Sequence, residues 1–420
     1  MRPTGRLHLG HYFGALSNWL KLQEEYDCFF FVADWHALTT HYEDTSSIAE
    51  NTLQIAMDWL SVGLDPEKST LFIQSRILEH AELHLILSMI TPLSWLERVP
   101  TYKEQIDNLK DRDLGTYGFL GYPLLQTADI VMYGDPRQDL LVPVGEDQVP
   151  HVELSREVVR KFNFNCGLRV DVRAMETDKQ GPLSVQQGFF LLLHVLDSLE
   201  GRGSNSVFGP SIPDVDVKDI AQRIRRIALS SGFVNIEEAL RRLAKEHQIF
   251  HKYVRFEEVL REPNYLLTET PRLPGLDGRR MAKSYGNAIW LTDPPDEIRT
   301  KVRNMMTDPQ RQRRTDPGRP EICPVFAWHK LFSPPETIAW SEQGCRTAGI
   351  GCVQCKAAMA DNLVKWIEPI QTKRKELESR PQKVWDILDA GSKMARKTAE
   401  STMERVRNAV FKWDEAQKAR

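Results

Sequence analysis

Apolar and polar positions alternate along the first part of the chain in a way that predicts strands and helices in turn. Helical spacing covers 13–22, 48–60 and 148–162, and short apolar runs typical of buried strands cover 28–34, 70–74 and 139–144. Strands that alternate with helices predict an α/β fold with a doubly wound parallel sheet. In such a sheet, ligands bind beyond the carboxyl ends of the strands.

The pattern changes further along the chain and predicts four segments. Residues 1–167 form the first part of the sheet domain, and 168–254 form a mainly helical insertion whose role the sequence does not indicate. The sheet pattern returns over 255–292, and 293–420 is helical apart from the loop at 310–323.

The composition limits which kinds of partner, nucleic acid or membrane, the chain can bind. The 420 residues include 55 basic and 58 acidic side chains, so a polyanionic partner would need a local basic face. We find no run of about 20 apolar residues and no apolar targeting segment at the N-terminus. We therefore expect a soluble, cytoplasmic protein without a membrane partner.

Two histidines stand three residues apart in His8-Leu9-Gly10-His11, and we call residues 8–11 the histidine turn. Free backbone N–H groups at a helix start attract phosphate, and imidazoles at i and i+3 lie on one side of the helix. The turn could therefore donate hydrogen bonds to a phosphate whose charge develops in a transition state. Gly10 has no side chain, so a flat base could approach the backbone there. The alternative is a pair of ordinary surface histidines.

A second candidate segment is the basic loop, residues 277–287, in which Arg279, Arg280 and Lys283 lie between two glycines. The glycines predict a mobile loop, and its cations could reach a triphosphate. A solvated surface loop is the alternative.

The third candidate is Gly145-Glu146-Asp147-Gln148, which follows an apolar strand and opens a helix. Its carboxylate and amide groups could bind a ribose or an α-amino group. An ordinary helix N-cap is the alternative.

With these segments the chain resembles the class I aminoacyl-tRNA synthetases and, within them, the tryptophanyl-tRNA synthetases. The histidine turn is similar to their first ATP motif, and 280–284, Arg-Met-Ala-Lys-Ser, is similar to their Lys-Met-Ser-Lys-Ser loop. Residues 34–39 and 145–148 match segments of the tryptophan and tyrosine branch, and 122–130 is closest to the tryptophan enzymes.

The resemblance covers 1–167 and 256–420. It implies a Rossmann-like catalytic domain of the His-x-Gly-His nucleotidyl transferases and a helical domain at 293–420 that binds the tRNA anticodon. It also implies a homodimer. L-Tryptophan and ATP-Mg would form tryptophanyl-adenylate and pyrophosphate, and the amino acid would pass to the 3′ end of tRNA(Trp).

The resemblance also assigns roles to individual residues. His8, His11 and Lys283 would be catalytic, with Lys283 holding the pyrophosphate. The ATP site would consist of Arg2, Pro3, Thr4, Gly10, His11, Gly145, Glu146, Asp147, Leu273, Arg280, Met281, Ala282, Lys283 and Ser284. Tryptophan would be bound by Asp129, Gln148 and His36.

Asp129 would accept the indole N–H. An indole nitrogen is only a donor, and a buried acceptor that indole satisfies discriminates strongly against phenylalanine. Without the resemblance, an exposed helix carboxylate would be the ordinary interpretation of Asp129.

Four of the six cysteines fall close together: Cys323, Cys345, Cys352 and Cys355. In a cytosolic protein such clustering indicates a metal centre rather than disulfides. Four thiolates suit structural zinc or a [4Fe–4S] cluster, and free thiols are a third alternative. A subgroup of bacterial tryptophanyl-tRNA synthetases has a run one residue longer and binds a [4Fe–4S] cluster, so the resemblance favours the cluster over zinc.

The chain departs from the family pattern in three places. Arg280 replaces the first lysine of the loop motif, and Ala282 replaces its serine and lacks the hydroxyl. Only seven residues precede His8, too few for the strand that normally leads into this turn, so we expect the natural start to lie upstream. These departures leave two alternatives open: a catalytically impaired RNA-binding or regulatory paralogue, and a tyrosine-specific enzyme.

Overall fold

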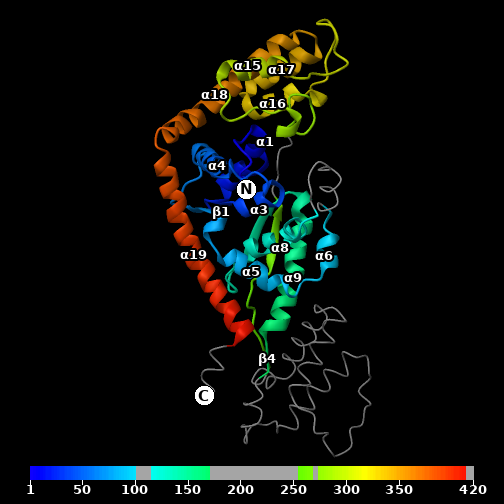
Figure 1. Cartoon of the computed structure of the whole chain (residues 1–420). Helices are drawn as coiled ribbons and strands as arrows, with labels where there is room; N and C mark the ends of the chain where they lie inside the picture. The colour runs from blue at the N-terminus through cyan, green and yellow to red at the C-terminus, as the bar shows by residue number, and fades with distance from the viewer. Residues whose placement is uncertain (101–114, 171–253, 268–272, 413–420) are drawn as a thin grey trace, which may run out of the picture. The chain divides into compact units, whose positions relative to one another are not determined.

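The computed structural model describes residues 1–100, 115–170, 254–267 and 273–412 (Figure 1). They belong to two compact units. Unit 1 contains Met1–Ile77 and Leu267–Arg396, and unit 2 contains Leu78–Leu266 and Lys397–Arg420. Among the described helices, none combines the length and apolar character that crossing a membrane requires.

The first part of unit 1 has the predicted strand–helix–strand order. Strand β1 (Cys28–Val32) pairs in parallel with β2 (Ser69–Ile73), and helix α4 (Ile48–Val62) lies between them in sequence. Helix α4 ends at Gly63, whose φ of 115° is the left-handed conformation that glycine adopts without strain. The strands and the helix predicted here are confirmed.

Strand β1 ends two residues before the predicted boundary because Asp34 opens helix α3 (Asp34–His41) instead. The Asp34 carboxylate accepts hydrogen bonds from the backbone N–H groups of Trp35 and Ser75, at 3.1 and 3.0 Å. It therefore ties the start of α3 to the short 3-10 helix η2 (Gln74–Arg76) that follows β2.

The N-terminal helix begins at Leu9, as the interpretation of the histidine turn assumed and four residues before the apolar spacing at 13–22. It consists of α1 (Leu9–His11), a π-helical turn η1 (Tyr12–Leu16) and α2 (Ser17–Leu22). Such π-helical turns are frequent at functional sites. The backbone of Met1 lies beside β1, donating to the Phe31 carbonyl at 2.7 Å and accepting from the Ala33 N–H at 2.8 Å.

The second part of unit 1 is helical, as predicted, after a short 3-10 helix η4 (Lys283–Tyr285) in the basic loop. Its elements are α15 (Pro295–Arg303), η5 (Pro320–Ile322), α16 (Pro324–Phe332), α17 (Pro335–Arg346), α18 (Cys352–Glu378) and α19 (Pro381–Phe411), which continues into unit 2. Proline opens several of these helices, where its missing N–H costs nothing. Trp59 and Trp328, both 0% exposed, lie in one core that joins the two parts of unit 1.

Unit 2 consists of helices and short strands. The helices are α5 (Glu79–Ser88), α6 (Leu93–Glu97), α8 (Tyr117–Val131) and α9 (Val149–Gly167), and a 3-10 helix η3 (Glu146–Gln148) precedes α9. Strand β3 (Leu140–Val144) pairs with β6 (Pro263–Leu267), which confirms the strand predicted at 139–144. Strand β4 (Leu168–Val170) pairs antiparallel with β5 (Val254–Phe256).

The β4–β5 pair brings together the two ends of the segment expected to be an insertion, 168–254. Residues 171–253 lie outside the described part of the chain, and so do the helices expected there. The division of the chain into these four segments stays a prediction.

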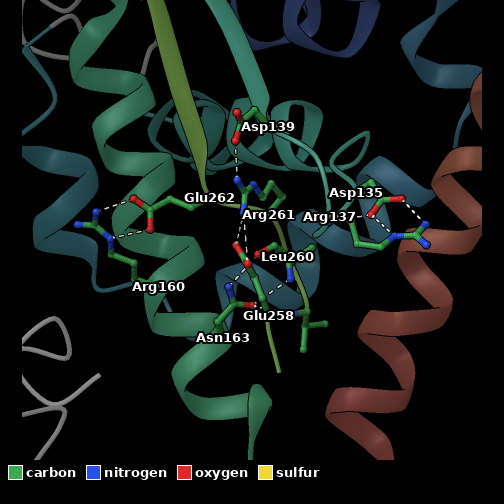
Figure 2. A network of polar contacts seen from close by, with 10 residues as sticks. Asp135, Arg137, Asp139, Arg160, Asn163, Glu258, Leu260, Arg261 and Glu262 are labelled. Atoms are coloured by element: carbon green, nitrogen blue, oxygen red, sulfur yellow. Dashed lines mark hydrogen bonds and ion pairs between the residues drawn. The ribbon is translucent and has the colours of Figure 1, made fainter. Parts of the chain in front are cut away.

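A polar network in unit 2 fastens α9 to the segment that enters β6 (Figure 2). The Asn163 side chain donates to the Leu260 carbonyl at 2.8 Å and accepts from the N–H groups of Val259 and Leu260 at 3.1 and 2.9 Å. Arg160, one turn earlier on α9, pairs with Glu262 through two nitrogens at 2.5 and 2.9 Å. These contacts fix the chain where the sheet pattern returns.

Candidate active site

The two rings of the histidine turn lie against each other. Their centroids are 3.7 Å apart, and the backbone N–H of His8 donates to Nδ1 of His11 at 3.2 Å. Because Nδ1 of a neutral His11 is the acceptor, its proton sits on Nε2, which can donate to a ligand. His8 is 5% exposed, and its Nδ1 is buried without a hydrogen-bond partner in the described chain.

Gly10 allows the His8 ring to adopt this position. A Cβ at Gly10 would lie 2.9 Å from two atoms of the His8 ring, closer than side chains tolerate. The Gly10 N–H points toward Sδ of Met281 at 3.3 Å. In this structure the His8 ring and Met281, rather than open space for a base, therefore surround Gly10.

The basic loop reaches the histidine turn through Lys283. Its Nζ donates to the Thr4 carbonyl at 2.8 Å and lies 5.8 Å from the centroid of the Trp290 ring. The nearby Gly5 has a φ of 115°, and a Cβ there would lie 3.0 Å from Nζ of Lys283. Two segments more than 270 residues apart in sequence thus meet, as the prediction of a shared phosphate site requires.

Backbone pairing holds the two segments together. The Leu9 N–H donates to the Ile289 carbonyl, and the Leu291 N–H donates to the Leu7 carbonyl, both at 3.0 Å. Between them, His8 and Trp290 form an antiparallel bridge. The chain just after the basic loop therefore fixes the backbone of the histidine turn.

Asn287 closes the basic loop, a role that the sequence did not indicate. It is 3% exposed and accepts from the Ala282 N–H at 2.9 Å. Its amide nitrogen donates to Asp277 at 2.7 Å and to the Arg280 carbonyl at 3.1 Å. The backbone at Arg280 and Ala282, where the family pattern is broken, is therefore held independently of those two side chains.

Both histidines are neutral near pH 7. Burial, followed by the charge of His11, lowers the pKa of His8 to about 3. Burial, followed by the charges of Arg280 and Lys283, lowers the pKa of His11 to about 4. The imidazoles can therefore serve as neutral hydrogen-bond donors, while the cations of the basic loop supply positive charge.

This protonation state predicts how stability depends on pH. Because the pKa of His11 is lower in the folded than in the unfolded chain, the unfolded chain binds more protons between about pH 4 and 6.5. The free energy of unfolding should rise with pH across this window and level off above it. In urea unfolding, His11→Gln should reduce the gain between pH 5 and pH 7 by about 1 kcal/mol. An unchanged gain in the variant would contradict a neutral, buried His11.

In unit 2, the predicted indole acceptor Asp129 lies in α8 and is 4% exposed. Its Oδ1 lies 2.5 Å from Nδ1 of His80, a residue of α5 that is 0% exposed. Nε2 of the same ring lies 2.6 Å from the Tyr133 hydroxyl. Burial, followed by the charge of Asp129, raises the pKa of Tyr133, so its hydroxyl stays protonated. No feature of the sequence had marked His80 or Tyr133 as part of this site.

The Gly-Glu-Asp-Gln segment lies where the sequence placed it, between β3 and α9. Glu146 and Asp147 are exposed, and Nε2 of Gln148 donates to Asp147 at 3.2 Å. A Cβ at Gly145 would lie 2.9 Å from the Asp147 carboxylate. These carboxylates are therefore accessible to a ligand.

The predicted site residues come from both units. Asp129 and 145–148 belong to unit 2. The others belong to unit 1: Arg2, Pro3, Thr4, His8, Gly10, His11, His36, Leu273, Arg280, Met281, Ala282, Lys283 and Ser284. Of these, Leu273 is 7% exposed and precedes Pro274, whose carbonyl accepts from Nε1 of Trp328 at 2.9 Å.

The four clustered cysteines gather in the helical part of unit 1. Burial raises the pKa of Cys355 to about 11, and the charges of the other three cysteines act in the same direction, so the sulfurs lie near one another. Sγ of Cys345 faces Arg311 at 3.6 Å, and a Cβ at Gly318 would lie 2.5 Å from it. The donor set therefore fits a soft metal centre in kind.

The cysteines do not form a closed ligand shell as they stand. Among the described residues, no three His, Cys, Asp or Glu side chains are grouped closely enough to hold a metal ion. Sγ of Cys355 lies instead 3.2 Å from the Ser341 hydroxyl and 3.4 Å from Nε2 of His329.

Known proteins are similar to this chain over nearly its full length. A family model for class I tRNA synthetases (W and Y) matches residues 1–205 and 236–368. A tryptophan–tRNA ligase from Ralstonia nicotianae is 46% identical over 410 residues, which cover 98% of this chain and 96% of the relative. The ligase from Thermotoga maritima is 40% identical, with 98% and 97% covered.

Solved structures agree with the sequence comparison. A tryptophanyl-tRNA synthetase from Campylobacter jejuni, complexed with ADP and tryptophane, matches with a TM-score of 0.67 at 25% identity, covering 98% of both chains. The chain belongs to the class I tRNA synthetases of the tryptophan and tyrosine family. It has their Rossmann-like α/β fold with a helical C-terminal region.

Proposed function

We infer that this chain is a tryptophan–tRNA ligase. The observation that carries the inference is the contact of the histidine turn with the basic loop, through Lys283 and the Thr4 carbonyl at 2.8 Å. The full-length relatives named tryptophan–tRNA ligase, at up to 46% identity, support tryptophan as the amino acid.

The reaction has two steps. A carboxylate oxygen of tryptophan attacks the α-phosphorus of ATP, which is bound with Mg²⁺, and pyrophosphate leaves to give tryptophanyl-adenylate. A hydroxyl of the terminal ribose of tRNA(Trp) then attacks the acyl carbon, and AMP leaves. The protein contributes mainly by holding the reactants and by stabilising the charge that develops.

In the first step, residues of unit 1 would donate hydrogen bonds to the phosphates and balance their charge. Nε2 of His11 can donate a neutral hydrogen bond to phosphate. The backbone N–H groups of Leu9 and His11 are already bonded to carbonyls and that of Gly10 faces Met281, so the side chain rather than the helix start is proposed to make this contact. Lys283 and Arg280 balance the charge of the departing pyrophosphate. The Lys283 ammonium is already placed at the turn, so little reorganisation precedes the transition state.

Asp129 is proposed to select the amino acid. A carboxylate that is 4% exposed and already bonded to His80 has a fixed orientation, and the proposal is that it accepts the indole N–H. A substrate without that N–H leaves one acceptor position of this buried carboxylate unused, which costs binding energy.

Pyrophosphate exchange into ATP tests the inference directly. The purified chain should exchange labelled pyrophosphate with tryptophan and not with tyrosine or without an amino acid. Exchange with tyrosine instead would support the tyrosine-specific alternative. Exchange with no amino acid at all would support the non-catalytic paralogue.

We further propose that Cys323, Cys345, Cys352 and Cys355 hold a [4Fe–4S] cluster, with structural zinc as the alternative. The four neighbouring thiols and the adjacent Arg311 guanidinium support a centre with negative charge. Such a centre would cross-link the helices and loops that carry the cysteines when bound.

Metal analysis after anaerobic purification tests this proposal. We expect about four iron atoms and matching sulfide per chain. Cys352→Ser should abolish the iron, whereas Cys28→Ser, in β1, should keep it. Zinc without iron would favour the alternative, and neither metal in the wild-type chain would contradict both.

Homodimer formation, a cytoplasmic location and binding of tRNA(Trp) by 293–420 belong to the same proposal. They rest on the family resemblance, and the relatives' names support only tRNA(Trp) as the partner.

A further inference from the structure

The backbone just before the histidine turn is held by a side chain 51 residues further along the chain. The Leu7 N–H donates to Oδ2 of Asp58 at 2.8 Å, and the Leu7 carbonyl accepts from Leu291. Asp58 belongs to α4 and is 0% exposed. Leu7 is thus fixed on both sides, and His8 follows it directly.

The second oxygen of Asp58 faces a cation from the helical part of unit 1. Oδ1 pairs with Nη1 of Arg374, a residue of α18 that is 2% exposed. Three further guanidinium N–H groups also donate hydrogen bonds. Arg374 donates to the Gln54 carbonyl at 3.2 Å, to the Gln54 side chain, and to Glu378 at 3.1 Å.

This arrangement is poorly explained as a device for stability alone. Taking two charges out of water is costly, and apolar residues of similar size often stabilise a protein as well or better. What a buried pair with several hydrogen bonds provides is a defined geometry. The Asp58 carboxylate has one oxygen on α18 and the other on the backbone before His8, so it bridges them.

We propose that Asp58 and Arg374 are positioning residues for the activation step. Arg374 orients the Asp58 carboxylate, and that carboxylate sets the backbone from which His8 and His11 project. This inference rests on the proposed function only in taking the histidine turn as the ATP motif. It adds that the placement of the motif depends on α18, outside the sheet domain.

Arg374 lies on the same helix as two of the clustered cysteines. Helix α18 begins at Cys352 and contains Cys355, 19 positions before Arg374. A helix of that length spans about 28 Å. The helix that carries two of the clustered cysteines thus also carries the cation that orients Asp58, with Pro369 between them.

Two variants and one control test the proposal. Arg374→Lys keeps the charge but loses the planar fork that reaches Asp58, Gln54 and Glu378 together. Gln54→Ala removes one acceptor of Arg374 and serves if the lysine variant does not fold. The control is Asp308→Asn, which removes the charge of another buried carboxylate, one that pairs with Arg319 at 2.7 Å.

The first measurement is amide hydrogen exchange at Leu7, made without substrates. We expect exchange at Leu7 to become about tenfold faster in Arg374→Lys and to stay at the wild-type rate in Asp308→Asn. The second is steady-state pyrophosphate exchange. We expect kcat to fall about tenfold to a hundredfold in Arg374→Lys, with KM for tryptophan within about twofold of wild type.

Two results would overturn the proposal. One is wild-type exchange at Leu7 or wild-type kcat in a folded Arg374→Lys chain. The other is an equal loss of kcat in Asp308→Asn, which would mark a general effect of lost stability. A wild-type chain without any tryptophan-dependent exchange would contradict the proposed function instead, and the Leu7 measurement would still decide whether the pair orients the turn.

Discussion

Lys283→Ala should lower kcat for tryptophan-dependent pyrophosphate exchange by about a hundredfold to a thousandfold, the usual effect of removing one preorganised charge-stabilising group. Its ammonium lies at the Thr4 carbonyl beside the histidine turn, and the side chain is exposed, so alanine leaves no cavity. We therefore expect the midpoint of thermal unfolding to change little. KM for tryptophan should also stay near its wild-type value.

Arg279→Ala is the matched control for this prediction. Arg279 belongs to the same basic loop and is also exposed, but its guanidinium pairs with Asp277 at 2.6 Å and lies 4.6 Å from the Tyr285 ring centroid. We expect its kcat to remain within about threefold of wild type, as for other exposed pairs. Equal losses in the two variants would contradict a specific role for Lys283.

Asp129→Ala should lower kcat/KM for tryptophan by about a hundredfold, because the indole N–H would lose a buried, charged acceptor. The variant also leaves His80 without the contact that it makes at 2.5 Å. Part of the fall in kcat/KM would therefore come from a displaced His80 ring. A second experiment has to separate this displacement from the loss of the indole acceptor.

A tryptophan analogue whose indole nitrogen is replaced by sulfur separates them. This benzothiophene analogue has nearly the same shape but no N–H, so Asp129 has nothing to accept from it. The wild-type chain should strongly prefer tryptophan, and Asp129→Ala should use both substrates about equally. A variant that keeps the full preference would contradict the role of Asp129 as indole acceptor.

Local patterns predicted the parts of the site that lie within single segments. Histidines at i and i+3 around a glycine, and a basic loop between glycines, are visible in sequence because each depends on neighbouring residues. The strand–helix–strand order of β1, α4 and β2 was equally visible, since burial of one face imposes a period on the sequence. Helix α3 was not predicted, and the strand before it ends earlier than expected, because Asp34 begins the helix and its carboxylate bonds to the backbone of Trp35 and Ser75.

Long-range pairing could not be predicted in this way. Nothing around Asp58 or Arg374 indicates that they meet across 316 residues, and His80 has no local feature that marks it as a partner of Asp129. The neutral state of His8 and His11 likewise depends on burial and on cations far away in sequence. Such relations exist only once the helices have packed.

Aminoacylation of tRNA tests the central claim most directly. The purified chain should be incubated with ATP, Mg²⁺, total bacterial tRNA and labelled tryptophan, with labelled tyrosine in a parallel reaction. We predict that tryptophan becomes attached to tRNA up to the fraction that is tRNA(Trp), and that tyrosine does not. Charging with tyrosine, or no charging by a folded and metal-loaded chain, would contradict the assignment as a tryptophan–tRNA ligase.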